Sequence, residues 1–593
     1  MASETDLALR GGGFLLVEVS PDRVFIPEEL NEDHLQLKRM THNFVEKEVA
    51  PRIEELEEKK EGVITSLLRQ AGDLGLLGLE VPEEFGGLSL DKYSTVVVGE
   101  EVPRGGSFAV AYAAHTGIGT LPIVYFGTSQ QKAKYLPALA SGEKIAAYCL
   151  TEPGSGSDAL GAKTTAVLNA EGTHYILNGT KQFITNAGFA DIFLVYAKVD
   201  GKLTNFIVER DMPGVSFGLE EKKMGIRGSS TRQVILEDVA VPAENVVGEL
   251  GRGHVVAFNI LNVGRFKLAA AAMGSAQLVL ETALGYAAER KQFGVPLTYF
   301  GAIQAKLAEM AAQTYVAESV VYRTAGLMEE GFRGLDLTGD CRKEAGKALE
   351  EYAIECSLNK VLASEVLDFV ADEGVQIHGG YGFIQEYPIE RMYRDSRINR
   401  IFEGTNEINR LLVPGTLLKR AMSGELPLLQ AAQAVGKELL SASPAGQEEG
   451  LGGVLRLVQK GKKLFLMAAG LAAQREGNAL KDNQFVLMAL AEMVLQIYAA
   501  ESAVLRAMKL EGLEVQAKHK LFAAKASTLA AYTAFNSLEQ QAKEVICAVE
   551  KGDAQATALA GVKKLARRAN ADLIGLRREL AAMTVEQGKY PLR

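Results

Sequence analysis

A single acidic residue in the segment Ile401-Phe402-Glu403-Gly404-Thr405-Asn406-Glu407 is the strongest candidate for a catalytic group in this chain. Glu403 lies between apolar residues and a glycine, so its side chain can enter an apolar cavity while flexible backbone approaches a ligand closely. Removal from water raises the pKa of a carboxylate toward working pH, which makes such a residue a candidate general base. Considered alone, a solvated or helix-capping glutamate is the commoner alternative, and the rest of the chain decides between them.

A loop rich in glycine and serine, residues 148–158, leads into a predicted β module and exposes many backbone N–H groups. Such a loop can surround a flat ligand with polar edges, or a phosphate. It has neither the lysine of a P-loop nor a G-x-G-x-x-G pattern, and an ordinary turn is an equally good interpretation. In a following strand, Phe183 and Thr185 alternate onto one face and offer a ring for stacking and a hydroxyl. For Phe183 alone, an ordinary half-buried aromatic is the favoured alternative.

A long predicted helix carries two more candidate positions. Arg290 stands at its end, in the segment Glu289-Arg290-Lys291-Gln292-Phe293-Gly294. It can hold a pyrophosphate, although a cation at a helix C-terminus also suits the helix dipole. Gly264 lies inside an Ala-rich part of the same helix, where glycine costs roughly 1 kcal/mol relative to alanine. It therefore predicts that another group packs closely against the helix there.

Bulk properties limit the classes of function. With 593 residues, three or four domains are expected, and a hydrophobic fraction of 47% is that of a soluble globular protein. A net charge of −10 argues against nucleic acid as a partner. The four cysteines form no C-x-x-C pair, so we expect no metal site, no disulfide framework and a reducing compartment. We also expect no secretory signal and no spanning helix.

The hydrophobic periodicity divides the chain into five parts. We expect an N-terminal extension (1–27), a helical domain (28–146), a β domain (147–253), a helical bundle (254–423) and an extra helical domain (424–593). The fold class is therefore mainly α with a β domain in the middle. Asn178-Gly179 predicts a hairpin turn between two strands, and long helices are predicted over about 254–290, 301–330 and 341–374.

The order and wording of these motifs over roughly residues 30–420 resemble the acyl-CoA dehydrogenase family. Tyr148 to Asp158 is similar to its first signature, and Gln376 to Phe383 with Arg394 to Arg397 is similar to its second. The helical tail after residue 424 resembles the very-long-chain branch. The resemblance implies a four-helix bundle in residues 254–423, a barrel-like β domain, and FAD bound between the two.

The resemblance also assigns roles to individual positions. Glu403 is implied as the base that removes the α-proton of an acyl-CoA thioester, while the β-hydride passes to FAD and trans-2-enoyl-CoA forms. The residues implied in FAD binding are Tyr148, Leu150, Thr151, Ser157, Phe183, Thr185, Arg290, Gln292, Gln376, Gly379, Gly380, Thr405 and Glu407. Those implied in substrate binding are Ser157, Asn262, Arg265, Ala114 and Gly404. Arg290, Gln292 and the stretch 376–380 are implied to reach the FAD of a neighbouring subunit.

Three departures from the family pattern accompany the resemblance. Phe183 stands where relatives usually have Trp, and Glu407 where a neutral or shorter side chain is common. Pro414-Gly415 predicts a helix break after Leu412, where relatives continue the helix. Some branches carry the catalytic acid at the position of Gly264; here that position has no side chain, which assigns the base to Glu403.

The resemblance further implies a substrate and partners. In medium-chain relatives a Glu near Ala114 closes the acyl pocket; the small residue here, with Gly117 nearby, predicts a deep pocket and a preference for long chains, since each buried CH₂ contributes roughly 0.8 kcal/mol. We expect a homodimer, electron-transferring flavoprotein as acceptor, and a cytoplasmic location. A basic amphipathic stretch around 454–465 offers peripheral contact with the inner face of a membrane, against the alternative of a helix packed on the bundle. An acyl-CoA oxidase and an assembly or binding protein of the same fold remain alternatives.

Overall fold

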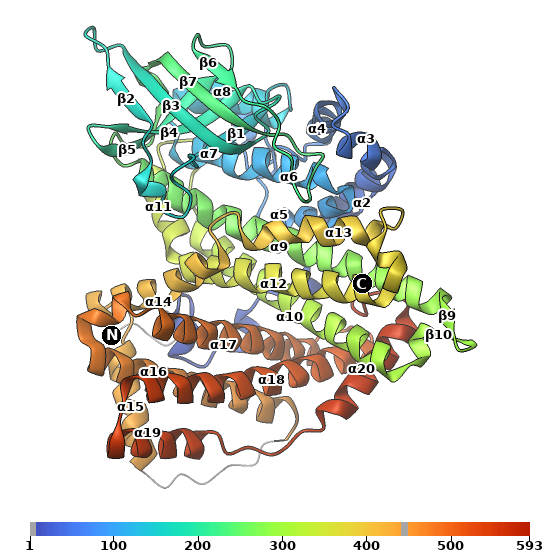
Figure 1. The fold of residues 1–593 in the computed structure, drawn as a ribbon. Coiled ribbons are helices and arrows are strands. Elements are labelled where there is room, and N and C mark those ends of the chain that lie inside the picture. The colour runs from blue at the N-terminus through green and yellow to red at the C-terminus, as the bar shows by residue number, and fades with distance from the viewer. Residues whose placement is uncertain (1–6, 441–448) are drawn as a thin grey trace.

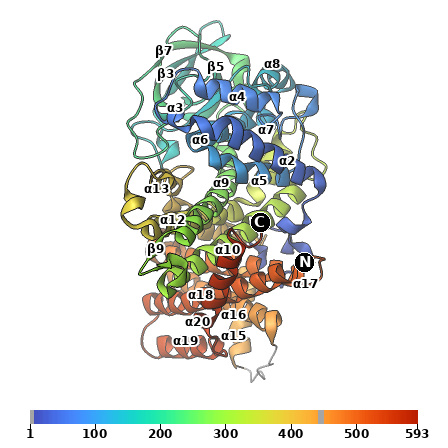
Figure 2. The same cartoon turned by 90° about the vertical axis from the view of Figure 1, so that its right-hand side faces the viewer.

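The computed structural model describes residues 7–440 and 449–593. Residues 1–6 of the predicted N-terminal extension and residues 441–448, near the start of the predicted extra domain, lie outside the described residues. The chain forms a small helical domain beside a β domain, then a central layer of long helices, then a second helical layer made by the C-terminal part (Figures 1 and 2).

The N-terminal domain is built from short helices, three of which begin at a side-chain cap. Its helices are α2 (Glu32–Phe44), α3 (Ile53–Glu57), α4 (Val63–Asp73), α5 (Lys92–Glu101), α6 (Ser107–Ala113), α7 (Leu121–Phe126) and α8 (Ser129–Ala140). Asn31, Asp91 and Thr128 accept N-cap hydrogen bonds at α2, α5 and α8. Between α6 and α7 the chain forms a π-helical turn, η8 (Ala114–Gly119). Such turns are rare and are frequent at functional sites.

The β domain is one eight-stranded sheet that stays open. Its strands are β1 (Ala146–Cys149), β2 (Thr165–Leu168), β3 (His174–Thr185), β4 (Ile192–Val199), β5 (Lys202–Glu209), β6 (Val215–Phe217), β7 (Thr231–Pro242) and β8 (Val246–Val247). Their order is β6-β7-β3-β2-β4-β5-β8, and β1 pairs in parallel with β4. Within the described residues no pairing joins β6 to β8, so the barrel-like description needs correction: the sheet does not close.

The predicted hairpin at Asn178-Gly179 is wrong, because β3 runs unbroken through both residues. It pairs antiparallel with β7 over nearly its whole length, with a register shift between Leu177 and Gly179. A Cβ at Gly179 would lie 2.4 Å from Thr164 Oγ1, so the glycine serves a bulge packed closely on its neighbour. The long pairing with β7 outweighs the local turn preference.

The central layer consists of α9 (Gly253–Glu289), α10 (Gly301–Phe332), α11 (Arg342–Glu351), α12 (Ala353–His378) and α13 (Pro388–Ser396), with the small ribbon β9 (Lys291–Gln292) and β10 (Val295–Pro296) at one end. Helices α9 and α12 pack directly on each other. The predicted helix over 341–374 is divided at Tyr352, the residue between α11 and α12.

Helix α14 (Asn406–Ser423) contradicts the predicted break, since Pro414 lies inside it. A proline in a helix interior costs about 3 kcal/mol in isolation. Here Pro414 is buried and, with Phe465 of α16 and Leu487 of α17, lines an apolar pocket beside the packing of α14 on α17. Packing against the C-terminal domain therefore holds the helix through the proline.

The C-terminal domain contains α15 (Leu428–Leu440), α16 (Gly450–Glu476), α17 (Gln484–Glu511), α18 (Ala517–Val549), α19 (Gly552–Leu565) and α20 (Leu573–Gln587). Helices α17, α18 and α20 also pack on α10 of the central layer. The N-terminal segment enters this interface: the Phe14 ring lies 4.8 Å from Tyr498, and Lys462 Nζ donates to the Val17 carbonyl at 2.8 Å.

Three helical stretches, Ser107–Phe126, Gly253–Glu289 and Gln484–Glu511, are long and apolar enough to cross a membrane by length and composition. This differs from the expectation of none. Their most apolar windows are 78%, 72% and 72% buried inside the protein. The apolar stripe of α16 is buried too, with Leu464 fully enclosed, so the packed-helix alternative for this stretch is the observed one.

Candidate active site

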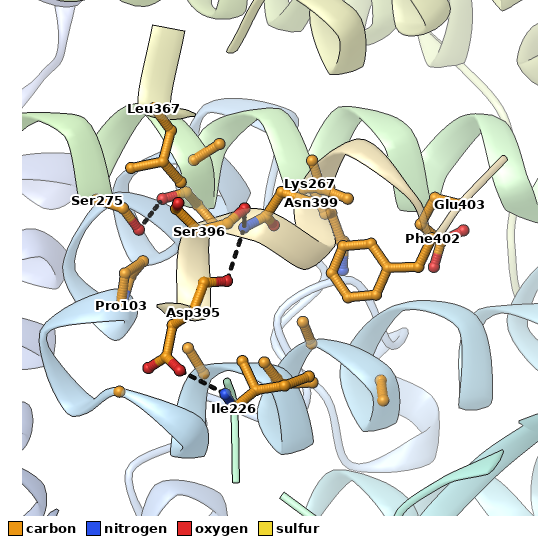
Figure 3. A pocket seen from close by; sticks show the side chains of 18 of the residues that line it. Pro103, Ile226, Lys267, Ser275, Leu367, Asp395, Ser396, Asn399, Phe402 and Glu403 are labelled. Atoms are coloured by element: carbon orange, nitrogen blue, oxygen red, sulfur yellow. Dashed lines mark hydrogen bonds between the residues drawn. The ribbon is translucent and has the colours of Figure 1, made fainter. Parts of the chain in front are cut away.

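Glu403 stands at one end of a cavity of about 170 Å³ between the N-terminal domain and the central helices. In Figure 3, Glu403 and Phe402 lie at one side, and Pro103, Ser275 and Asp395 lie at the other. The walls are mainly small and apolar. They include Ala109, Val110, Ala113, Ala114, Gly117, Ile118, Gly264, Leu268, Ala271, Ala272, Leu278, Val279 and Leu367.

The backbone at the base is held in an unusual conformation. Glu403 has φ 58° and Gly404 has φ 80°, both in the left-handed region. For a residue with a side chain this costs of order 1–3 kcal/mol and persists only where neighbours enforce it. Thr405 then caps α14, its Oγ1 accepting from the Ile408 N–H at 3.2 Å. The turn therefore sets the direction of the Glu403 side chain, and helix α14 begins directly after the turn.

Three buried side chains hold the carbonyls of this turn. Arg265 Nε donates to the Glu403 carbonyl at 3.2 Å, and Lys360 Nζ donates to the Gly404 carbonyl at 2.8 Å. Asn409 Nδ2 donates to the Gly404 and Thr405 carbonyls at 2.8 and 3.0 Å. Neither Lys360 nor Asn409 was identified from the sequence. The one available signal was a lysine between Asn359 and Val361 in a predicted helix.

Asn262 and Arg265, predicted to contact the CoA arm, are buried beneath the turn. Arg265 Nη1 donates to Asn262 Oδ1 at 2.9 Å, and Asn262 Nδ2 donates to the Leu349 carbonyl at 3.4 Å. These bonds all go to protein groups. The CoA contact stays a prediction, whereas the contact of Arg265 with the base is a finding.

Gly264 packs against the carboxylate, as its place in the helix predicted. A Cβ at this position would lie 2.8 Å from Glu403 Oε2 and 3.2 Å from Ile118. Oε2 is out of solvent and has no hydrogen-bond partner among the described residues. The missing side chain thus makes the space that the carboxylate occupies, and leaves one oxygen free to accept a proton.

The electrostatics suit a general base. Burial raises the pKa of Glu403 to about 7, and the positive charges of Arg265 and Lys360 oppose the rise. A base with a pKa near working pH combines a substantial ionised fraction with useful basicity.

The cavity wall also includes the π-helical turn η8 and one lysine of a buried ion cluster. Ala114 and Gly117 face the cavity from η8. Lys267 lines it from α9, while its Nζ pairs with Glu80 Oε2 at 2.5 Å and donates to the Thr116 carbonyl at 3.2 Å. Lys92 Nζ also pairs with Glu80, at 2.5 Å. Sequence reasoning missed this cluster, in which Glu80 pairs with both lysines at the cavity wall.

The residues predicted to line FAD from the β domain fall into three groups. Thr185 lines the cavity, and the Tyr148 hydroxyl reaches the Ala257 carbonyl of α9 at 3.4 Å. Phe183 is 61% exposed at φ 58°, and Ser157 is exposed as well. Leu150 is buried in the apolar core, and the Thr151 carbonyl accepts from the Gln182 N–H at 2.8 Å. Near the base, Thr405 is half-buried and Glu407 is exposed in the first turn of α14.

The remaining predicted FAD contacts lie elsewhere in the chain. Arg290 and Gln292, with Gln376, Gly379 and Gly380, are all exposed. The Arg290 guanidinium lies 5.4 Å from the Tyr381 ring, which joins these two segments. In Figure 1 the β9 ribbon and the start of α14 are at opposite ends of the central layer. Within one chain these residues do not meet Glu403, so a role at this site requires a second subunit.

Comparison with known protein families and relatives shows to which family this chain belongs. Models described as the acyl-CoA dehydrogenase N-terminal, middle and C-terminal domains match residues 31–143, 147–239 and 251–418, and a second C-terminal domain model matches residues 460–564. A probable acyl-CoA dehydrogenase of Bacillus subtilis (strain 168) is 52% identical over 100% of both chains. The chain belongs to the acyl-CoA dehydrogenase family, and it is an oxidoreductase of that family.

Two other similarities are informative. The very long-chain specific acyl-CoA dehydrogenase of Homo sapiens mitochondria is 37% identical over 84% of this chain and 78% of that one. A crystal structure of an acyl-CoA dehydrogenase complexed with FAD, from Bacillus anthracis, superposes with a TM-score of 0.95 at 53% identity, over 98% of this chain and 99% of that one. Butyryl-CoA dehydrogenase from Megasphaera elsdenii gives a TM-score of 0.60 at 38% identity and matches only 66% of this chain.

Proposed function

We propose that this protein is an FAD-dependent dehydrogenase of long-chain acyl-CoA, converting it to trans-2-enoyl-CoA in fatty acid β-oxidation with electron-transferring flavoprotein as acceptor. The observation that carries the proposal is the buried Glu403 carboxylate, with one oxygen unpartnered among the described residues, at the end of an apolar cavity. A proton-abstracting base is the chemistry that this arrangement suits.

The residues present fit FAD. Phe183 exposes 61% of its surface, and a side chain at Gly154 or Gly156 would meet no atom within 4 Å, so this face has room for a flat ligand. The Bacillus anthracis structure named above contains FAD. Tyr148, Thr151, Ser157, Phe183 and Thr185 would hold FAD from the β domain. FAD, when bound, supplies the acceptor for a hydride from the β-carbon of the substrate.

The chain's own part in the reaction is proton transfer. Glu403, with a pKa of about 7, takes the α-proton of the thioester. Gly264 leaves the space in which the carboxylate sits, and Arg265 favours its ionised form. The apolar walls exclude water, which strengthens these interactions.

The decisive experiment is an anaerobic titration of the flavin-loaded enzyme with palmitoyl-CoA, with loss of flavin absorbance as the readout. We expect bleaching in the wild type, and turnover of Glu403→Gln lower by ~10²–10⁴-fold with FAD retained. Glu143→Gln, an exposed glutamate far from the cavity, is the matched control. Substantial turnover by Glu403→Gln would contradict the assignment.

The same experiment separates the alternatives. An acyl-CoA oxidase would bleach anaerobically and release peroxide in air, while a binding or assembly protein without activity would show no bleaching. The similarity to acyl-CoA dehydrogenases in the family models, the Bacillus subtilis relative and the Bacillus anthracis structure favours the dehydrogenase. Transfer to electron-transferring flavoprotein is tested by reduction of that partner in place of dioxygen.

Assembly and location complete the proposal. We expect a homodimer, because Arg290 and Gln292 are exposed and the β9 ribbon, which contains Gln292, lies at the other end of the central layer from the start of α14. The described cysteines are free thiols, which suits a reducing cytoplasm. Contact with a membrane through α16 would require its buried apolar face to leave the bundle. Co-sedimentation of the intact chain and of one ending at residue 424 with anionic vesicles tests that contact.

A further inference from the structure

Lys360 is a buried cation beside the base. It lies on α12 and is 0% exposed, and no carboxylate of the described residues pairs with it. Its ammonium donates instead to the Gly404 carbonyl at 2.8 Å and to Asn406 Oδ1 at 2.6 Å. Both acceptors belong to the turn that follows Glu403. A buried ammonium is costly to maintain, so its position calls for a role in that turn.

The turn depends on such donors. The left-handed conformations of Glu403 and Gly404 are held by hydrogen bonds to three successive carbonyls, and Lys360 supplies the cationic donor to the middle one. Through Asn406 it also fixes the first residue of α14, where Asn406 Nδ2 donates to Ser364 Oγ at 3.1 Å. One side chain therefore ties the base turn both to α12 and to the helix behind it.

The charged groups around Lys360 come from four elements. Glu403 on the turn has the largest favourable effect on the ammonium, followed by Glu365 on α12 and Glu407 on α14, while Arg265 on α9 opposes them. Glu365 is already bound by Arg410, at 2.7 Å and 2.8 Å, and Glu407 is exposed. The Glu403 carboxylate is thus the main counter-charge that is still available to Lys360.

We propose that Lys360 is a positioning residue for the reaction: its ammonium fixes the left-handed turn that aims Glu403 into the cavity, and its charge favours the ionised base. The inference rests on the proposed role of Glu403. Burial lowers the pKa of Lys360 to about 7 and raises that of Glu403 to about 7, so the two groups titrate as a coupled pair. As the pH rises, Glu403 gains its negative charge over the range in which Lys360 loses its positive charge, and their attraction favours the state in which both are charged.

Three substitutions separate the hydrogen bond from the charge. Lys360→Met removes both, Lys360→Gln keeps a donor without the charge, and Lys360→Arg keeps both. The wild type loses activity as pH falls through the pKa of Glu403, because the protonated carboxyl cannot accept a proton. Without the charge of Lys360 the base is harder to ionise, so the midpoint of the kcat/KM profile moves to higher pH.

The measurement is kcat and KM of the flavin-loaded enzyme with palmitoyl-CoA from pH 5.5 to 9. We expect Lys360→Met and Lys360→Gln to shift the midpoint upward by about 1 unit, and Lys360→Arg to restore it. At high pH, where the base is ionised in every variant, Lys360→Met should still have a kcat about tenfold lower while Lys360→Gln recovers most of it.

Lys132→Met is the matched control. Lys132 is another fully buried lysine, whose Nζ donates to the carbonyls of Leu337 and Gly339 at 2.7 and 2.8 Å, far from the cavity. The Lys132→Met variant also loses hydrogen bonds from a buried ammonium to backbone carbonyls, and it should leave the pH profile unchanged.

An unshifted midpoint in both uncharged variants would overturn the charge role, and a full kcat of Lys360→Met at high pH would overturn the positioning role. Should Lys360→Met fail to fold, Lys360→Gln decides by its midpoint alone. A failure of the proposed function would be seen separately: palmitoyl-CoA would not reduce the flavin absorbance of the wild-type enzyme.

Discussion

The Glu403 carboxylate occupies the space that a side chain at position 264 would fill. The glycine at that position therefore accounts for the place of the carboxylate. The glycine in α9 leaves room for the carboxylate, with the site of a missing Cβ 2.8 Å from Oε2. Van der Waals contact between carbon and oxygen requires more than this. The sequence shows only a glycine that lowers helix stability; the structure shows what that loss permits.

Gly264→Ala should therefore uncouple stability from activity. Alanine favours the helix by roughly 1 kcal/mol, while the added methyl displaces the carboxylate, so we expect kcat to fall ~10²-fold without loss of thermal stability. Gly285→Ala is the matched control, because it lies in the same helix with nothing within 4 Å. Melting temperature and palmitoyl-CoA turnover are measured for both. Unchanged turnover in Gly264→Ala would contradict the close packing.

At the scale of elements, the π-helical turn η8 shapes the cavity beside Glu403. It presents Ala114 and Gly117 to the cavity, and its Thr116 carbonyl is bound by Lys267 of α9. Helices α9 and η8 are thereby joined across the wall that a long acyl chain would follow. The depth of the cavity depends on small residues at this turn.

Ala114→Leu should shift the preference toward shorter chains. The larger side chain adds three carbon atoms and takes the space of about three CH₂ groups, worth roughly 2.4 kcal/mol, so kcat/KM for palmitoyl-CoA should fall about 50-fold. Butyryl-CoA, which does not fill the cavity, is the internal control. A series of acyl-CoA substrates checks the change, and an equal loss with every chain length would mean a general structural defect.

The sequence predicts features that depend on neighbouring residues and misses those that depend on contacts between distant parts of the chain. The long helices and the exceptional glutamate are visible in adjacent residues. The Asn178-Gly179 hairpin and the Pro414 break were wrong because pairing with β7 and packing on α16 and α17 outweigh local preferences. Lys360 could not be connected to the base from a single sequence, because it and Gly404 are 44 positions apart. The roles taken from the family resemblance depend on shared motifs, and most of the cofactor contacts stay predictions.

At the scale of the whole molecule, buried ion pairs join the C-terminal domain and the N-terminal segment to the central layer of helices. Arg506 of α17 is 1% exposed and pairs with Glu318 of α10 at 2.7 Å and with Glu28 of the N-terminal segment at 2.6 Å. The Tyr590 hydroxyl also donates to Glu318, at 2.8 Å. The C-terminal domain and the N-terminal segment are therefore parts of one packed structure with the central layer.

Arg506→Met should destabilise the protein strongly. It leaves two carboxylates without their cation, and breaking a buried pair in this way typically costs ~3–5 kcal/mol. Arg333→Met, which removes an exposed pair with Glu330 at the end of α10, should cost less than about 1 kcal/mol. Urea unfolding followed by circular dichroism compares the two. Equal stability of both variants would contradict the claim that the buried ion pairs of Arg506 stabilise the packing of the C-terminal domain on the central layer.

The pairing of Glu28 with Arg506 spans 478 positions. During synthesis at 5–20 residues per second, the first partner therefore waits on the order of 25–100 s for the second to be made. Until then Phe14 and Leu15, which end up enclosed, have no finished surface to cover them. During synthesis, Phe14 and Leu15 therefore stay without their partner surface until α17 has been made.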